Sequence, residues 1–250
     1  MFKKILTCLT LFATISFAAW DNVPILKKGN GQVAGKIGYT SQDPLSGVIV
    51  AAGVRYSALN WLELSAMVPF GFYSYSYQGK YIDESGLMNA QIGLRFQVSQ
   101  GFSLFVDGHA PGSIEFSQNQ FAVEFGLQHS NLFSSVTWAK YIGYMLGDPW
   151  KNQYLYFGTE IQILLNHFVI YSELRILMGQ ENAHYCSGGY SCSDEGGSNG
   201  FLFGIGVKID LTDVLTLDIS AELGSGDRFR NEELNLGEPY AFGATLFYNF

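Results

Sequence analysis

The sequence predicts an all-β protein: a transmembrane antiparallel up-and-down β-barrel of about 12 strands. Three observations lead to this fold class. Apolar and polar residues alternate along most of the chain, which is the period of a strand with one apolar face. Charged residues make up only 14% of the sequence and aromatic residues 16%, whereas soluble domains usually contain about 25% charged residues. Short turns and longer polar loops also alternate between the expected strands.

The first 18 residues predict a cleaved export signal. Lys3 and Lys4 form a positive n-region, residues 5–15 form an apolar h-region, and small residues precede an expected cleavage after Ala18. The apolar run is far shorter than the ~20 residues that a transmembrane helix needs. We therefore expect export through the Sec route as a cleaved precursor.

The mature chain is expected to hold a periplasmic N-terminal segment at residues 19–31 and one barrel at residues 32–250. Strands are expected at residues 32–39, 47–56, 61–70, 87–97, 102–110, 120–128, 132–140, 155–163, 168–177, 201–209, 215–223 and 240–250. Short turns are expected at residues 57–60, 99–101, 129–131, 165–167 and 211–213. Longer loops are expected at residues 41–46, 71–85, 111–117, 142–152, 179–200 and 224–239.

The orientation of the two strand faces separates two architectures. A soluble barrel or sandwich points its apolar face inward, whereas a membrane barrel points it outward to lipid. The low charge content, the even strand count and the aromatic residues near the ends of the apolar faces favour the membrane barrel. Met88 is then expected on the lipid face. The residues expected to line the lumen are Lys36, Arg55, Glu63, Arg95, Asp107, Glu124, Glu160, Glu173, Arg175, Lys208, Asp218 and Glu222.

The last expected strand, YAFGATLFYNF, carries an apolar or aromatic residue at every second position and ends on an aromatic residue. It resembles the C-terminal strand of bacterial outer-membrane β-barrel proteins. In that superfamily the strand is the signal that the barrel-insertion machinery reads. The resemblance implies an outer-membrane protein in contact with the lipid bilayer and lipopolysaccharide, with an insertion signal at Phe242, Leu246, Tyr248 and Phe250.

Two cysteines remain after the expected cleavage, and their setting predicts a disulfide. Cys186 and Cys192 lie in the Gly-rich segment HYCSGGYSCSDEGGSNG of an exported chain. A CxxC metal site needs closer spacing and more ligands. We therefore expect a loop clip without a catalytic role, and we predict no metal site and no cofactor.

The net charge of the chain restricts the kinds of partner that it can bind. The formal net charge is −8, and it falls to about −10 once Lys3 and Lys4 are removed. Nucleic-acid partners need a basic face, so this class is excluded. A lumen lined by both signs of charge fits either a narrow passive channel for small polar solutes or a structural barrel whose ion pairs plug the lumen.

An outer-membrane surface hydrolase, a protease or a lipid hydrolase, is the alternative function. Asp107 and His109 are two residues apart on the polar face, so the carboxylate could orient the imidazole as a general base at the loop end of the barrel. The pair looks like the Asp-x-His half of outer-membrane aspartyl-type proteases. The paired Asp-x-Asp of that family is missing from this sequence.

Overall fold

A closed antiparallel sheet forms the whole described part of the chain. The computed structural model describes residues 25–77, 80–113, 121–147, 154–179, 199–226 and 238–250. Its strands are β1 (Gly31–Gln42), β2 (Leu45–Leu59), β3 (Leu62–Tyr77), β4 (Lys80–Leu87), β5 (Gln91–Ser99), β6 (Phe102–His109), β7 (Ala122–Phe133), β8 (Val136–Leu146), β9 (Tyr154–Leu164), β10 (Phe168–Gly179), β11 (Asn199–Asp210), β12 (Leu215–Ser225) and β13 (Tyr240–Asn249). Both β4 and β5 pair with β3, so they fill one position of a 12-strand barrel. The predicted fold class is confirmed.

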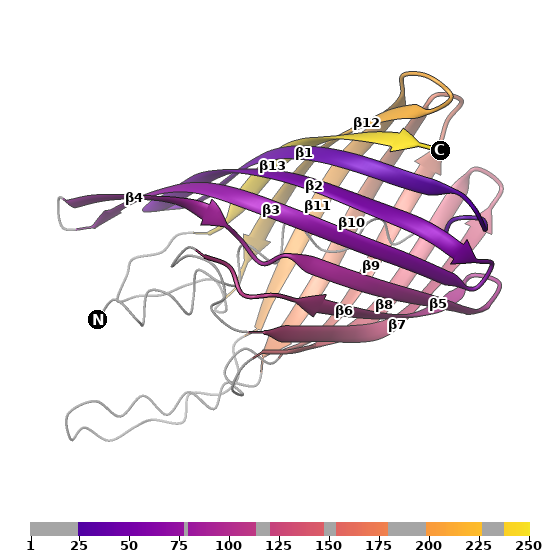
Figure 1. Cartoon of the computed structure of the whole chain (residues 1–250), viewed down its shortest axis with the longest axis horizontal. Coiled ribbons are helices and arrows are strands. Elements are labelled where there is room, and N and C mark those ends of the chain that lie inside the picture. The colour runs from indigo at the N-terminus through magenta and orange to yellow at the C-terminus, as the bar shows by residue number, and fades with distance from the viewer. Residues whose placement is uncertain (1–24, 78–79, 114–120, 148–153, 180–198, 227–237) are drawn as a thin grey trace.

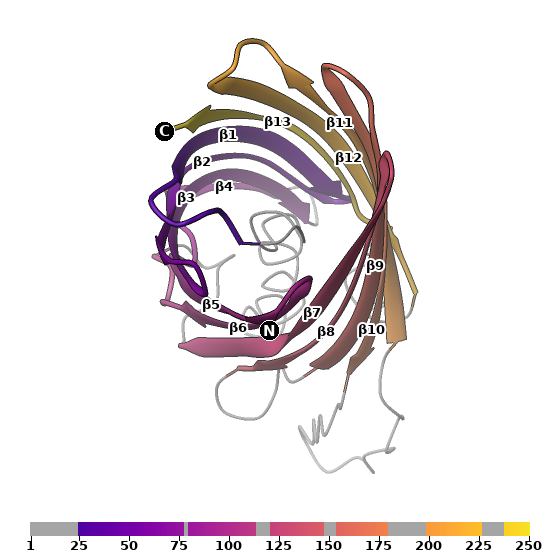
Figure 2. The same cartoon turned by 90° about the vertical axis from the view of Figure 1, so that its right-hand side faces the viewer.

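The barrel closes between its first and last strands. Each strand pairs with the next in sequence, except that β3 pairs with both β4 and β5. The ring closes where β1 pairs with β13 over ten residue pairs that begin with Gln32 opposite Asn249 (Figure 2). Gly31 N donates to Phe250 O at 2.8 Å, and Phe250 N donates to Gly31 O at 3.0 Å. Inside a bilayer, every main-chain polar group left unpaired at this seam would cost several kcal/mol.

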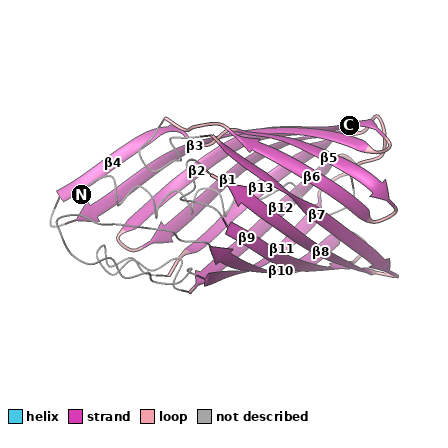
Figure 3. Cartoon of the chain, turned by 90° about the horizontal axis from the view of Figure 1, so that it is seen from below, coloured by secondary structure: helices cyan, strands magenta, loops and turns pink. Residues whose placement is uncertain are grey.

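Alternation of burial along each strand separates an inner face from an outer face. On β1, Gln32 and Ala34 are buried, whereas Val33 and Ile37 are 45% and 55% exposed. Large apolar side chains are exposed on the outer face of nearly every strand, and the strands that carry them run steeply tilted across the barrel (Figure 3). This continuous apolar outer surface is the lipid-facing band of a membrane barrel. No helix within the described residues is long and apolar enough to cross a membrane.

The two ends of the barrel differ in their connections. The short turns that follow β5, β7, β9 and β11 gather at one end, where β13 also ends (Figure 1). We call this the short-turn end and the opposite one the loop end. At the loop end, β3 and β4 continue as a hairpin that projects beyond the other strands (Figure 1).

Several expected turns and loops are strands in the structure. Residues 71–77 and 80–85 belong to the β3–β4 hairpin, and the connection expected at 41–46 is a tight turn between Gln42 and Leu45. The turn expected at 129–131 lies instead at residues 134–135, where Ser134 has a φ of 55°. Polar residues suggested breaks in all three places, but backbone pairing extends further into each segment than the sequence pattern indicated.

The expectation for Met88 is also wrong, and the reason is an extra residue opposite a proline. Between the pairs Phe70↔Leu87 and Met67↔Gln91, three steps along β3 face four steps on the other side. Pro69 has no N–H for the ladder, and the N–H of Met88 donates to its carbonyl at 3.0 Å. The extra residue inverts the alternation, so Met88 is buried inside the barrel.

Inward-facing aromatic rings lie over glycines on neighbouring strands. Tyr141 on β8 is opposite Gly158 on β9, and Gly143 is opposite Tyr156 on the same pair of strands. A Cβ added at either glycine would overlap the facing tyrosine ring. The same arrangement joins Tyr171 to Gly206, Phe105 to Gly126 and Tyr73 to Gly47. These contacts keep the rings flat against the inner wall.

A methyl group placed under one of these rings should destabilise the barrel. We expect Gly143→Ala to lower the free energy of unfolding by about 1–3 kcal/mol, because the added carbon displaces the Tyr156 ring. Urea titration followed by heat-modifiable gel mobility measures this change.

Gly35→Ala is the matched control, because an added Cβ at Gly35 meets nothing within 4 Å. It should change the free energy of unfolding by less than about 0.5 kcal/mol. Equal effects of the two substitutions would contradict a specific role for ring-over-glycine packing.

Candidate functional site

The structure places all twelve residues expected at the lumen on the inner faces of their strands. They alternate with exposed apolar neighbours, and several are nearly inaccessible: Glu63 is 1% exposed, Asp107 2% and Arg175 8%. The twelve residues are Lys36, Arg55, Glu63, Arg95, Asp107, Glu124, Glu160, Glu173, Arg175, Lys208, Asp218 and Glu222. Every charged strand residue of this set therefore points away from the apolar outer band.

An ion pair and a tyrosine on β8 and β10 form one half of an inner-wall network. Arg175 Nη2 donates to Glu173 Oε1 at 2.8 Å, and Arg175 Nε donates to Tyr141 Oη at 3.1 Å. The Tyr141 hydroxyl in turn donates to Glu173. The guanidinium also stands 5.5 Å from the centroid of the Tyr141 ring. The three side chains therefore satisfy one another at the barrel wall.

The second half of this inner-wall network continues to β6. The Tyr156 hydroxyl donates to Glu124 on β7, and His109 Nε2 lies 3.4 Å from Glu124 Oε2. The Tyr156 ring packs edge-on against Tyr141 with a centroid separation of 5.9 Å. Arg175 lies 5.7 Å from the Tyr156 ring and so joins the two halves. The network thus spans five neighbouring strands, from β6 to β10.

Asp107 and His109 point to different neighbours. The Asp107 carboxylate lies over Gly93 on β5, where an added Cβ would overlap it and the Ser65 hydroxyl. His109 Nε2 lies next to Oε2 of Glu124 on β7, on the other side of β6. The carboxylate that the structure pairs with the imidazole is therefore Glu124.

A second polar network lies at the short-turn end, close to the closing seam. Gln32 Nε2 donates to Asn249 Oδ1 at 2.7 Å, and Arg55 Nε donates to Gln32 Oε1 at 2.9 Å. Arg55 Nη1 is 3.9 Å from Glu63 Oε1, and the other oxygen of Glu63 accepts from the N–H of Leu26 at 2.8 Å. Polar contacts therefore run from β13 across β1 and β2 to β3.

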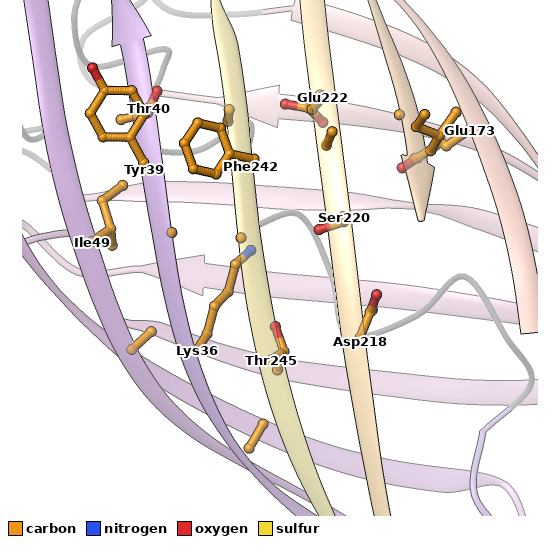
Figure 4. A pocket seen from close by; sticks show the side chains of 18 of the residues that line it. Lys36, Tyr39, Thr40, Ile49, Glu173, Asp218, Ser220, Glu222, Phe242 and Thr245 are labelled. Atoms are coloured by element: carbon orange, nitrogen blue, oxygen red, sulfur yellow. The ribbon is translucent and has the colours of Figure 1, made fainter. Parts of the chain in front are cut away.

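A cavity of about 170 Å³ opens into the lumen beside β1, β13 and β12. Figure 4 shows Lys36 on β1 facing the same space as Asp218 and Glu222 on β12 and Glu173 on β10. Ser220, Thr40 and Thr245 add hydroxyl groups to its wall. The cavity can offer a hydrated solute both hydrogen-bond donors and acceptors, with carboxylates in excess.

The structural role of the tyrosines is not evident from alternation alone. Alternation places Tyr156 and Tyr171 on the polar face of their strands but does not mark their contacts, and Tyr141 falls beyond the end of the strand expected at 132–140. A signal was present, because Tyr-x-Gly occurs at 141–143 and again at 156–158. On antiparallel strands in this register, each tyrosine meets the glycine of the other motif.

Two expectations concern metals and cysteines. Within the described residues, no three His, Cys, Asp or Glu side chains gather closely enough to hold a metal ion. Cys186 and Cys192 lie outside the described residues, as does the expected signal at residues 1–18.

Comparisons with known structures agree with the barrel. An outer membrane channel from Pseudomonas putida F1 matches 93% of this chain and 99% of its own, with a TM-score of 0.63 and 12% identity. The NanC porin matches 86% and 98%, with a TM-score of 0.56 and 9% identity. LpxR from Salmonella typhimurium matches 87% and 99%, with a TM-score of 0.55 and 8% identity. No protein-family model matches the chain, and no curated protein matches it in sequence.

The chain therefore has the fold of the outer-membrane barrels that it matches, a closed antiparallel barrel of 12 strands. At 8–12% identity, the three matched structures support this fold but do not indicate a shared activity. The function therefore has to be argued from the inner wall of this chain.

The inner-wall network yields a stability prediction. Arg175→Met should lower the free energy of unfolding by about 1–3 kcal/mol, because Glu173 and the Tyr141 hydroxyl lose a charged partner. A double-mutant cycle with Glu173→Gln, measured by urea titration, should give a coupling energy of about 0.5–3 kcal/mol. Additive effects within error would mean that the ion pair does not stabilise the barrel.

Proposed function

We propose that this protein is an outer-membrane channel that passes small polar solutes, with a mild preference for cations. The observation that carries the proposal is the lumen cavity, whose wall is built from charged and hydroxyl side chains. A barrel of this size lies between packed eight-stranded barrels and the wide channels of porins with about 16 strands. It therefore suits solutes that lose only part of their hydration.

The charge balance of the inner wall supports a preference for cations. Seven of the twelve lumen residues are carboxylates and five are basic. Around the cavity, Glu160, Glu173, Asp218 and Glu222 face Lys36 and Arg175. Fixed charge of one sign in a narrow, low-dielectric passage concentrates the opposite ion.

The alternative within the same class is a structural barrel whose lumen is closed. The inner-wall network could serve this role, because its paired polar side chains fill space along β6–β10. The cavity borders that network at Glu173 and Arg175, and on its other side it is bounded by Lys36 on β1 and by Asp218 and Glu222 on β12, so the ion pairs of β6–β10 leave open volume beside them. For this reason we favour the channel.

The last strand and the N-terminal segment are proposed to direct the protein to the outer membrane. Phe242, Leu246, Tyr248 and Phe250 are all exposed on the outer face at the last strand, which fits a signal for the insertion machinery. The apolar outer band would contact bilayer lipid, and its loop end would contact lipopolysaccharide. Export would use the Sec signal expected at residues 1–18.

Conductance in planar bilayers tests the channel. The purified, folded protein should give discrete single-channel steps, and its reversal potential in a KCl gradient should favour K⁺. Asp218→Asn together with Glu222→Gln should lower the K⁺/Cl⁻ permeability ratio by about twofold to fivefold, because the cavity loses two negative charges.

Asp83→Asn is the matched control for that measurement. Asp83 carries the same charge but lies exposed on the β3–β4 hairpin, where it accepts from Ser74. Selectivity should be unchanged in this variant. An absence of conductance steps from correctly folded protein would favour the closed structural barrel.

A surface hydrolase is the second candidate, and the pairing of His109 with Glu124 is the observation that favours it. A carboxylate that orients an imidazole is half of a general-base arrangement. If peptide or lipid cleavage is detected, His109→Ala should lower its rate at least 100-fold, and Glu124→Gln should lower it less. Cleavage that persists unchanged in His109→Ala would remove this site from consideration.

A further inference from the structure

A single cation stands on the outer face of the described strands. Outward positions carry apolar, small or hydroxyl residues almost throughout, and the one outward carboxylate, Asp83, is on the projecting hairpin. Lys140 on β8 is the exception within the apolar band. A lysine at the lipid face costs about 2–4 kcal/mol at the bilayer midplane and less near the interfaces. Such a position calls for an explanation.

Trp138 lies beneath the ammonium group of this lysine, and Thr159 holds the indole in place. Lys140 Nζ stands 3.6 Å above the centre of the Trp138 ring. The indole Nε1 donates to Thr159 Oγ1 at 2.7 Å, and that hydroxyl donates to Ala139 O at 3.1 Å. The indole is therefore a fixed platform beneath the ammonium group. Its π face attracts the charge but accepts no conventional hydrogen bond from the three N–H donors.

An imidazole lies next to the lysine on the adjacent strand. His129 on β7 is the direct partner of Lys140 in the register, and both side chains are partly exposed on the outer face. Directly opposed residues of antiparallel strands have Cβ atoms about 4.5–5.5 Å apart. Two nitrogen-bearing side chains thus stand side by side in an otherwise apolar surface.

The position of His129 and Lys140 along the barrel axis indicates which part of the bilayer they contact. His129 and Lys140 are each four residues from the turn between Phe133 and Val136. At about 3.3 Å per residue and a tilt of about 40°, this is roughly 10 Å from the turn along the barrel axis. The ammonium reaches back over Trp138, which is nearer the turn than Lys140. Short turns face the periplasm in this class of barrel, so the donors lie toward the headgroups of the periplasmic leaflet.

We propose that Lys140 and His129, with Trp138 as platform, bind the phosphate of an anionic glycerophospholipid in the periplasmic leaflet. The phosphate would accept from the lysine ammonium and the imidazole, and the acyl chains would lie along the apolar band above them. Phe157 on β9, which is exposed and lies opposite Ile142, further from the turn than Lys140, offers that surface. This lipid site does not depend on whether the lumen conducts.

Native mass spectrometry of the purified protein in detergent, with phosphatidylglycerol added, tests the proposal. The wild-type protein should retain one lipid preferentially, and Lys140→Met should raise its dissociation constant at least about tenfold. Methionine keeps the length of the side chain and suits an apolar face, so the barrel should still fold, which heat-modifiable gel mobility verifies. His129→Phe should raise the dissociation constant by a smaller factor.

Lys208→Met is the matched control, because it removes the same charge from the inner wall, where Lys208 lies 5.2 Å from the Tyr171 ring centre. Lipid retention should be unchanged in this variant. Equal retention by Lys140→Met and Lys208→Met would overturn the proposal. Release of the lipid by excess inorganic phosphate would also overturn it, because the site would then bind phosphate from water.

A site-specific readout comes from Trp138 itself. Brominated phosphatidylglycerol in vesicles should quench its fluorescence, taken as the difference between wild type and Trp138→Phe. The quenching should weaken in Lys140→Met and persist in Lys208→Met. Quenching that is the same in both variants would mean that the lipid is not held by the lysine.

Discussion

Pairing of β1 with β13 is the constraint on which the rest of the barrel depends. An open sheet could present its apolar face to lipid, but it could not satisfy the main-chain groups at its two edges. The ten residue pairs of this seam remove both edges. Closure in turn creates an inside, and that inside permits buried charges such as Arg175 and Glu173 in a protein whose outer surface is almost uncharged.

The length and direction of the tyrosine side chains determine the polar contacts inside the barrel as much as charge does. Tyr141 and Tyr156 lie flat over glycines, so their hydroxyls extend sideways to the carboxylates of Glu173 and Glu124 instead of into the lumen. The polar groups along β6–β10 are thereby drawn into the wall. The opposite wall, which carries Lys36 and the carboxylates of β12, faces the cavity. The proposed channel rests on this asymmetry between a half whose polar groups pair with one another and a wall that borders the cavity.

Period-two alternation was sufficient to predict the barrel and the inward side of the twelve charged lumen residues, because side chains alternate strictly between faces. It failed where alternation itself breaks. Pro69 and the extra residue at Met88 invert the pattern locally. His129 suggested a turn because polar residues are rare on a lipid face, yet the strand continues through it. Contacts within the lumen depend on register, which the sequence of one strand does not specify.

The ring-over-glycine pairs also constrain how this sequence can drift. At the reciprocal Tyr141–Gly158 and Tyr156–Gly143 contacts, neither partner is free to change by itself, because a side chain at the glycine collides with the ring and a smaller residue at the tyrosine exposes bare backbone. Viable change at these sites would have to occur in concert across two strands. The four positions are therefore expected to covary, whereas most other positions on the inner surface can be substituted independently.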